Sequence, residues 1–172
     1  LLGVIAFIRQ GFYDATWYEK TGNILAKYPD GNEPIQKDRS LESLSRGIGN
    51  KQPFVFRTNN ELYIDRSENI ADEFDLNFWI RGNGYEYRRI DQMPASFMIV
   101  PLNFPGKPDV ADPYQALQYT TEQLKHWDMA PDNVAKLVAA GFQVALTGSD
   151  LKNKKDFQKN LSRSINRGLN ES

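Results

Sequence analysis

The sequence contains no cysteine and only one histidine among its 172 residues. The absence of cysteine excludes disulfide bonds, thiolate nucleophiles and metal sites with cysteine ligands. A catalytic zinc ion usually takes two or three histidine ligands, so His126 alone cannot build a histidine-rich metal centre. A carboxylate-only magnesium or calcium site remains open, although the carboxylates show no EF-hand spacing. No residue is therefore nominated as a metal ligand from composition and spacing.

An excess of charge and long apolar runs are also missing. Lysine and arginine number 21 against 22 acidic residues, so no uniform field attracts nucleic acid or an anionic membrane, and we expect neither as a partner. No apolar run approaches the ~20 residues of a membrane span. The opening Leu1–Ile8 lacks the cationic region of a signal peptide and reads as a cut into a longer chain. The composition is typical of a soluble globular protein, and the compartment stays unknown.

Short apolar runs alternate with segments of helical periodicity, which predicts an α/β fold with parallel strands. The expected strands lie at 54–56, 76–80, 97–100 and 142–146. Four strands are half of the eight that a closed (β/α)8 barrel needs. Two architectures therefore remain open: a complete small open sheet, or half of a barrel.

We expect the strands and the segments around them to form a single domain over residues 1–172. A helix over Val4–Glu19 and a polar loop over Thr21–Arg39 precede the βα units of residues 40–172. We expect Ser40 to cap the next helix, Thr58 and Glu61 to form a capping box, and a helix starting at Pro113 to cover Leu124.

Ligands of parallel α/β proteins gather at the carboxyl ends of the strands. Arg57 and Arg81 follow neighbouring strands, and two arginines placed so would clamp a carboxylate or phosphate. The simpler alternative is that each arginine pairs with a nearby acid. The candidate ligand-binding residues are Arg57, Asn59, Arg81, Asn83 and Asn103, and the candidate catalytic residues are Ser149 and Asp150.

Three other features favour structural roles. Ser149 lacks the G-x-S-x-G pattern of a nucleophile elbow. The glycines of Gly82–Gly84 suit a tight turn better than a phosphate-cradling loop. His126 is expected near a helix C-terminus, where a cation interacts favourably with the helix dipole.

Several motifs spread along the chain resemble the second half of amidohydrolase-superfamily barrels, and the imidazolonepropionase-like group in particular. They are Ile8–Ala15, Pro53–Asn59, Asp72–Phe74, Pro101–Pro105, His126–Asn133 and Gly141–Thr147. The resemblance covers nearly the whole chain, loosely over residues 21–39. It implies that the expected strands are the fifth to eighth of a TIM-like barrel. It also implies a family that hydrolyses C–N bonds with zinc or another divalent metal.

The resemblance places three family metal ligands on this chain. The histidine of the fifth strand falls on Arg57, that of the sixth on Gly82, and the aspartate of the eighth on Ser149, or on Asp150 with a shift of one residue. A guanidinium offers no free lone pair, and glycine has no side chain. The resemblance therefore implies a barrel half that keeps the fold and has lost the metal site.

We expect a fragment that is catalytically inactive alone, holds no cofactor, and has a structural or ligand-binding role beside the remainder of its parent polypeptide. Unpaired strand edges and an apolar inner face predict a homo-oligomer. One alternative is a metal-independent enzyme or anion-binding domain that uses Arg57, Arg81, Asn103 and Asp150. Another is an interaction module that binds through the loops 21–39 and 103–113.

Overall fold

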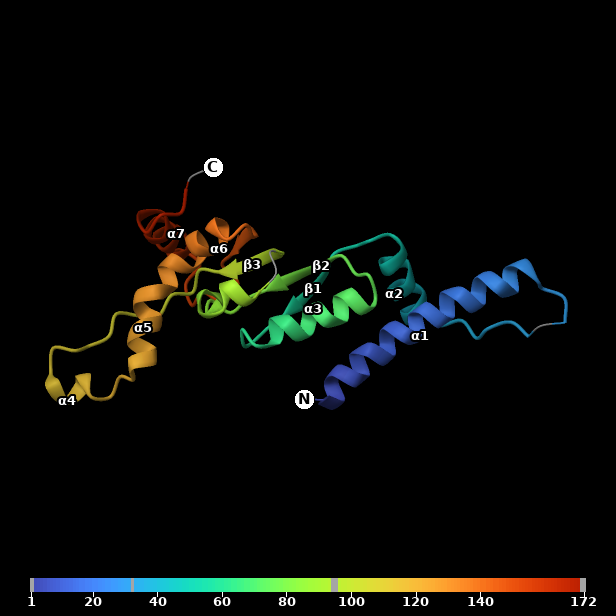
Figure 1. Cartoon of the computed structure of the whole chain (residues 1–172), viewed down its shortest axis with the longest axis horizontal. Helices are drawn as coiled ribbons and strands as arrows, with labels where there is room; N and C mark the ends of the chain where they lie inside the picture. The colour runs from blue at the N-terminus through green and yellow to red at the C-terminus, as the bar shows by residue number, and fades with distance from the viewer. Residues whose placement is uncertain (1, 32, 94–95, 171–172) are drawn as a thin grey trace. The chain divides into compact units, whose positions relative to one another are not determined.

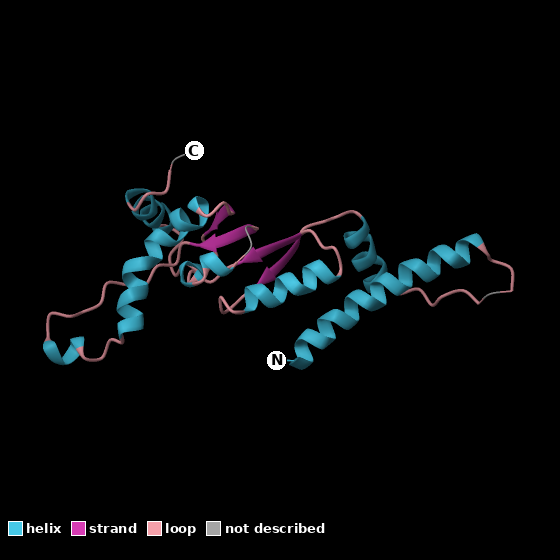
Figure 2. Cartoon of the chain, viewed as in Figure 1, coloured by secondary structure: helices cyan, strands magenta, loops and turns pink. Residues whose placement is uncertain are grey.

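The computed structural model describes residues 2–31, 33–93 and 96–170 (Figures 1 and 2). The strands are β1 (Phe54–Arg57), β2 (Phe78–Arg81), β3 (Phe97–Pro101) and β4 (Gln143–Thr147). The α-helices are α1 (Leu2–Lys27), α2 (Arg39–Gly49), α3 (Tyr63–Glu73), α4 (Pro113–Ala116), α5 (Thr121–Met129), α6 (Asn133–Ala139) and α7 (Asp156–Asn166). Short 3-10 helices are η1 (Glu86–Arg88), η2 (Ile90–Gln92) and η3 (Ala130–Asp132).

The strands form one parallel sheet in the order β1-β2-β3-β4, which confirms the predicted α/β class. Ile80 pairs with Met98, and Ile99 pairs with Ala145, so the register is continuous across β2, β3 and β4. The strand order follows the chain order without reversal. A doubly wound open sheet reverses direction at its switch point, whereas a barrel adds each strand beside the last. The topology is therefore that of part of a barrel.

The core of this sheet is built from apolar side chains that α3, α6 and the strands contribute. Ile64, Ile80, Met98, Val100 and Leu137 are fully buried there. Phe157 and Leu161 on α7, and Leu169 just beyond it, pack against this core. Burying such aliphatic side chains stabilises the fold by roughly 1.5–3 kcal/mol each.

The chain divides into two compact units: residues up to Phe54 together with Glu68–Asn77, and Val55–Ser67 together with residues from Phe78 onward. In the first unit α1 packs against α2. Phe12 is buried there, and its ring lies 5.7 Å from that of Phe54 and 5.1 Å from that of Phe74. The second unit carries most of the sheet. The expectation of a single domain over residues 1–172 stays a prediction.

Two expectations about the first helices were wrong. Helix α1 continues to Lys27, so the first part of the predicted loop 21–39 is helical. No proline interrupts the chain before Pro29. Because a proline disfavours helical backbone angles in the residue before it, Tyr28 is disfavoured in the helix, and α1 ends at Lys27. The cap of α2 is Asp38, whose carboxylate accepts the N–H groups of Ser40 and Leu41 at 2.8 and 3.1 Å. A longer acidic side chain therefore performs the role predicted for Ser40.

The predicted capping box at Thr58 and Glu61 was wrong, whereas a helix does start at Pro113, as predicted, but ends earlier than expected. The Thr58 hydroxyl donates to the Arg81 carbonyl at 3.3 Å, so it ties β1 to β2 and does not cap α3. The helix predicted from Pro113 through Leu124 is two helices, α4 and α5, because Thr120 starts a new one. Its hydroxyl accepts the N–H of Gln123 and its own N–H donates to the Gln123 side chain, which forms a capping box.

None of the helices in the described ranges combines the length and the apolar character needed to cross a bilayer.

Candidate functional site

Charged side chains from three strand ends meet at the carboxyl edge of the sheet. The Arg81 Nη2 atom lies 2.6 Å from Asp150 Oδ2 and donates to the Ser149 hydroxyl at 2.5 Å. Arg57 Nη2 lies 3.6 Å from Asp150 Oδ1. We call Arg57, Arg81, Ser149 and Asp150 the strand-end cluster. The structure thus brings the two predicted arginines together, each paired with the same acid, as the simpler alternative expected.

The two ion pairs of the cluster differ in strength. The Arg81 side chain is 17% exposed, while that of Arg57 is 62% exposed. A charge-assisted hydrogen bond in partly buried surroundings contributes about 1.5–3 kcal/mol, whereas a solvent-exposed pair contributes less than about 1 kcal/mol. The Arg81–Asp150 pair is therefore the main contact of the cluster. It joins the end of β2 to the turn after β4 across the intervening strand β3.

The donor set of the cluster does not fit a divalent metal ion. Each carboxylate oxygen of Asp150 faces a guanidinium group, and a metal ion there would have to displace both cations. Among the residues that the structure describes, no group of three or more His, Cys, Asp or Glu side chains is placed to hold a metal. Ser149 has no imidazole beside it in the described ranges, because His126 contacts Tyr85 and Tyr87 instead.

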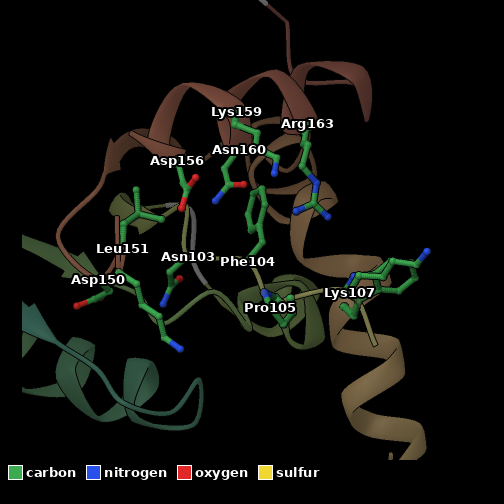
Figure 3. Close-up of a pocket in the computed structure, with 13 residues that line it drawn as sticks. Asn103, Phe104, Pro105, Lys107, Asp150, Leu151, Asp156, Lys159, Asn160 and Arg163 are labelled. Atoms are coloured by element: carbon green, nitrogen blue, oxygen red, sulfur yellow. The ribbon is translucent and has the colours of Figure 1, made fainter. Parts of the chain in front are cut away.

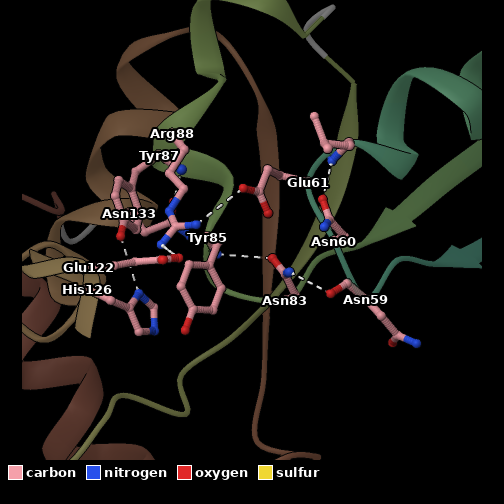
Figure 4. A network of polar contacts seen from close by, with 11 residues as sticks. Asn59, Asn60, Glu61, Asn83, Tyr85, Tyr87, Arg88, Glu122, His126 and Asn133 are labelled. Atoms are coloured by element: carbon pink, nitrogen blue, oxygen red, sulfur yellow. Dashed lines mark hydrogen bonds and ion pairs between the residues drawn. The ribbon is translucent and has the colours of Figure 1, made fainter. Parts of the chain in front are cut away.

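The three candidate asparagines do not join the strand-end cluster. The Asn83 amide donates to the Asn59 carbonyl at 3.1 Å, and its oxygen accepts the Tyr85 N–H at 3.0 Å (Figure 4). These bonds hold the turn after β2 against the turn after β1. Asn103 lies apart from them, in the wall of a cavity to which Asp150 also contributes.

Sequence reasoning missed the buried carboxylate of Glu86, which is 0% exposed. It accepts the N–H of Asn83 at 2.5 Å and that of Gly84 at 3.0 Å, and the Asn133 amide donates to it at 2.6 Å. A buried charge is tolerated only when hydrogen bonds replace its hydration. The Gly82–Gly84 segment was the available signal. The backbone N–H groups of Asn83 and Gly84 do cradle an anion, but that anion is a side chain of the same chain, and the Gly82 N–H donates to the Ile99 carbonyl instead.

Gly82 lies directly against this buried carboxylate. A Cβ atom added at residue 82 would lie 2.1 Å from Glu86 Oε1 and 2.7 Å from its Cδ. Real Cβ atoms do not approach other atoms this closely, so the buried Glu86 side chain would have to shift and would strain its hydrogen bonds to Asn83, Gly84 and Asn133. The carboxylate of Glu86 therefore occupies the space into which a side chain at residue 82 would extend. The position of the buried acid therefore depends on the absence of a side chain at residue 82.

His126 lies in the last turn of α5, where its ring joins an aromatic stack. Its ring lies 3.7 Å from the Tyr85 ring with an angle of 13° between the planes, and its Nδ1 is 3.4 Å from the Tyr87 hydroxyl. Arg88 lies over Tyr85 and binds Glu122 at 2.8 Å (Figure 4). Burial, and then the positive charge of Arg88, lower the pKa of His126. The predicted position near a helix C-terminus is confirmed, because His126 lies in the last turn of α5, while the lowered pKa disfavours the predicted cationic form.

Sequential parallel strands with a polar edge at their carboxyl ends define a barrel-type α/β protein. No protein-family model matches the chain, and a search of curated proteins finds no significant match. Among solved structures, the crystal structure of an amidohydrolase from Thermotoga maritima MSB8 superposes with a TM-score of 0.68 at 19% identity. The match covers 99% of this chain and 41% of that chain. The fold is therefore amidohydrolase-like, and the chain spans less than half the length of that protein.

The pairing of Gly82 with Glu86 predicts a strong coupling between substitutions. We expect Gly82→Ala to lower the free energy of unfolding by about 1–3 kcal/mol, because the new methyl group overpacks a filled space. Glu86→Ala should cost about 1–3 kcal/mol by leaving the Asn133 amide and two backbone N–H groups without an acceptor. In the Glu86→Ala background, the Gly82→Ala substitution should cost much less. Urea unfolding of the four proteins measures this coupling.

Gly106→Ala is the control for this cycle, because its added Cβ would meet no atom within 4 Å. Its effect should stay within about 0.5 kcal/mol. Equal costs of Gly82→Ala in the presence and absence of the Glu86 carboxylate would contradict the coupling.

The environment of His126 predicts the direction of its titration. Since the chain has one histidine, its imidazole NMR signals are unique, and they should titrate below the ordinary pKa of about 6.5. The unfolded chain then binds the proton more tightly than the folded chain. The histidine's contribution to stability is therefore complete above about pH 6.5 and is lost as the pH falls toward the folded-state pKa.

Tyr85→Ala should return the histidine pKa toward its ordinary value by exposing the ring to water, whereas Tyr114→Ala, at an exposed tyrosine of α4, should leave it unchanged. A histidine pKa at or above the ordinary value in the unaltered protein would show that the stack does not exclude the charged form.

Proposed function

We propose that this chain is part of an amidohydrolase-like barrel of the imidazolonepropionase-like kind that has no metal-dependent hydrolytic centre of its own. In this proposal the strand-end cluster has a structural role. It stabilises the carboxyl edge of a barrel half that supports the remainder of a longer polypeptide. The observation that carries the proposal is the ion pair between Arg81 and Asp150, because a guanidinium group already binds the acid that stands, with a shift of one residue, at the third implied ligand position.

Three local features support this proposal. Arg57 stands where the resemblance implies a histidine, and its guanidinium has no lone pair to offer. Gly82 stands at the second such position, where the Glu86 carboxylate fills the space of a side chain. The acid at the third position is held by Arg81 and Arg57.

A metal-independent enzyme or anion site at Arg57, Arg81, Asn103 and Asp150 has less support. Both arginines already face the same carboxylate, which removes much of their attraction for an external anion. Asn103 makes no hydrogen bond to any of these residues in the described part of the chain. The interaction module with contacts at 21–39 and 103–113 stays a prediction.

Metal analysis tests the proposal directly. We expect the protein, incubated with zinc and freed of excess metal, to retain much less than one equivalent by mass spectrometry, and its melting temperature to be insensitive to EDTA. Asp150→Ala should destabilise the fold by about 1.5–3 kcal/mol through loss of the charged hydrogen bond, with no change in zinc content. Asp91→Ala, at an exposed acid without such a pair, is the control. One equivalent of zinc that Asp150→Ala removes would contradict the proposal.

The proposal extends to what covers the apolar surface of α1. Leu2, Val4, Phe7 and Trp17 are all more than half exposed on this helix, with Phe7 at 81%. A helix that presents this much apolar surface usually packs against another chain or segment. We propose that a second copy of the chain covers it in the isolated protein, and that the remainder of the parent polypeptide covers it in a longer protein.

Light scattering tests the second copy. The unaltered protein should be a dimer or larger at about 10 µM, and Val4→Ser with Phe7→Ser should shift it toward the monomer because the apolar contact is lost. Tyr114→Ser with Leu117→Ser is the matched control, since it removes two equally exposed apolar side chains three residues apart in another region. A monodisperse monomer of the unaltered protein would contradict this part of the proposal.

A further inference from the structure

A cavity lies beside the strand-end cluster, on the side of α7. It has a volume of about 680 Å³. The loop after β3, the loop after β4 and one face of α7 form its walls, and α5 contributes Trp127. In Figure 3, Lys159 and Arg163 on α7 lie across the cavity from Pro105 and Lys107. All of these residues belong to the second unit, so the cavity is a feature of one compact body.

The charge around this cavity is unbalanced. Four cations line it: Lys107, Lys152, Lys159 and Arg163. In the described part of the chain, none of the four forms an ion pair with a carboxylate. The lining carboxylates are those of Asp150 and Asp156. Since Asp150 is already bound by Arg81, one free carboxylate remains to balance four positive charges. An anion from solution would relieve their mutual repulsion.

The cavity is also organised around fixed contacts. Asn160 is buried, and its amide donates to the Leu102 carbonyl at 2.6 Å, which holds α7 against the end of β3. The Arg163 guanidinium lies 5.2 Å from the centre of the Phe104 ring. Lys159 and Arg163 are one helical turn apart, so their side chains project from the same face of α7. Arg163 is therefore held by Phe104 before any ligand binds, and Lys159 projects beside it from the same face of α7.

We propose that this cavity binds a small organic anion with at least two negative charges, a di- or tricarboxylate or a phosphate ester. Lys159 and Arg163 bind one side of this anion, and Lys107 and Lys152 bind the other. The Asn103 amide, which makes no hydrogen bond within the described residues, supplies a further neutral donor. Phe104 and Trp127 offer apolar surface to the carbon skeleton of the ligand. A multivalent ligand fits because a single charge would leave most of the cations uncompensated.

Isothermal titration calorimetry with citrate, inorganic phosphate and acetate tests this site. Citrate or phosphate should bind with a stoichiometry of one, at least about tenfold more tightly than acetate. Lys152→Ala with Lys159→Ala should weaken that binding at least about tenfold. Lys154→Ala with Lys155→Ala is the matched control, because it removes the same charge from exposed neighbours that do not line the cavity. The control should bind within about twofold of the unaltered protein.

The outcomes separate clearly. Tighter binding of citrate assigns the site to carboxylates, and tighter binding of phosphate assigns it to phosphate esters. The absence of saturable binding up to about 10 mM, or equal losses in the two double variants, would overturn the site. Retention of zinc bears on the proposed function alone, so the two proposals fail independently.

Discussion

A buried carboxylate that is held without a cation shapes the sheet edge of this protein. In the described ranges Glu86 makes no ion pair, and its carboxylate accepts hydrogen bonds from backbone N–H groups and from the Asn133 amide. Such an arrangement requires that its donors stay fixed, because an unsatisfied buried charge is very costly. It also requires that residue 82 have no side chain. The turn after β2, the start of η1 and the first residue of α6 are therefore held together by one acid.

The polar groups of the carboxyl edge largely satisfy one another. Arg81 binds Asp150 and Ser149, Asn83 binds the turn after β1, and Glu86 takes the amides of its own turn. A catalytic edge differs, because its donors are aimed at the place where charge develops on a substrate. An edge whose groups are paired internally gains stability but offers little to a reacting molecule. This favours a supporting role for the edge and directs attention to the neighbouring cavity.

The sequence was sufficient for the strands and their parallel arrangement, because apolar runs and helical spacing are local patterns. It was also sufficient to nominate Arg57, Arg81 and Asp150, which follow strands whose ends share one edge. It could not identify partners across long separations. Arg81 and Asp150 are 69 residues apart, and Glu86 and Asn133 are 47 apart. The capping errors have a similar origin, since Asp38 and Ser40 are both good caps and Thr58 was engaged by a strand carbonyl instead. Local propensity cannot weigh a tertiary hydrogen bond against a cap.

Asp150 takes part in both the proposed structural role of the strand-end cluster and the proposed anion site. The net charge of the whole chain is −1, so composition alone hides the cationic cavity. Asp150 borders both regions, but its carboxylate is taken by the arginines of the strand-end cluster. Were it free, it would lie among the cavity's cations and neutralise part of their charge. The ion pair that, in the proposed function, takes the place of a metal site thus leaves the neighbouring lysines without Asp150 as a partner. If both proposals hold, the pairing of Asp150 at the sheet edge is what leaves the cavity's positive charge free for an external anion.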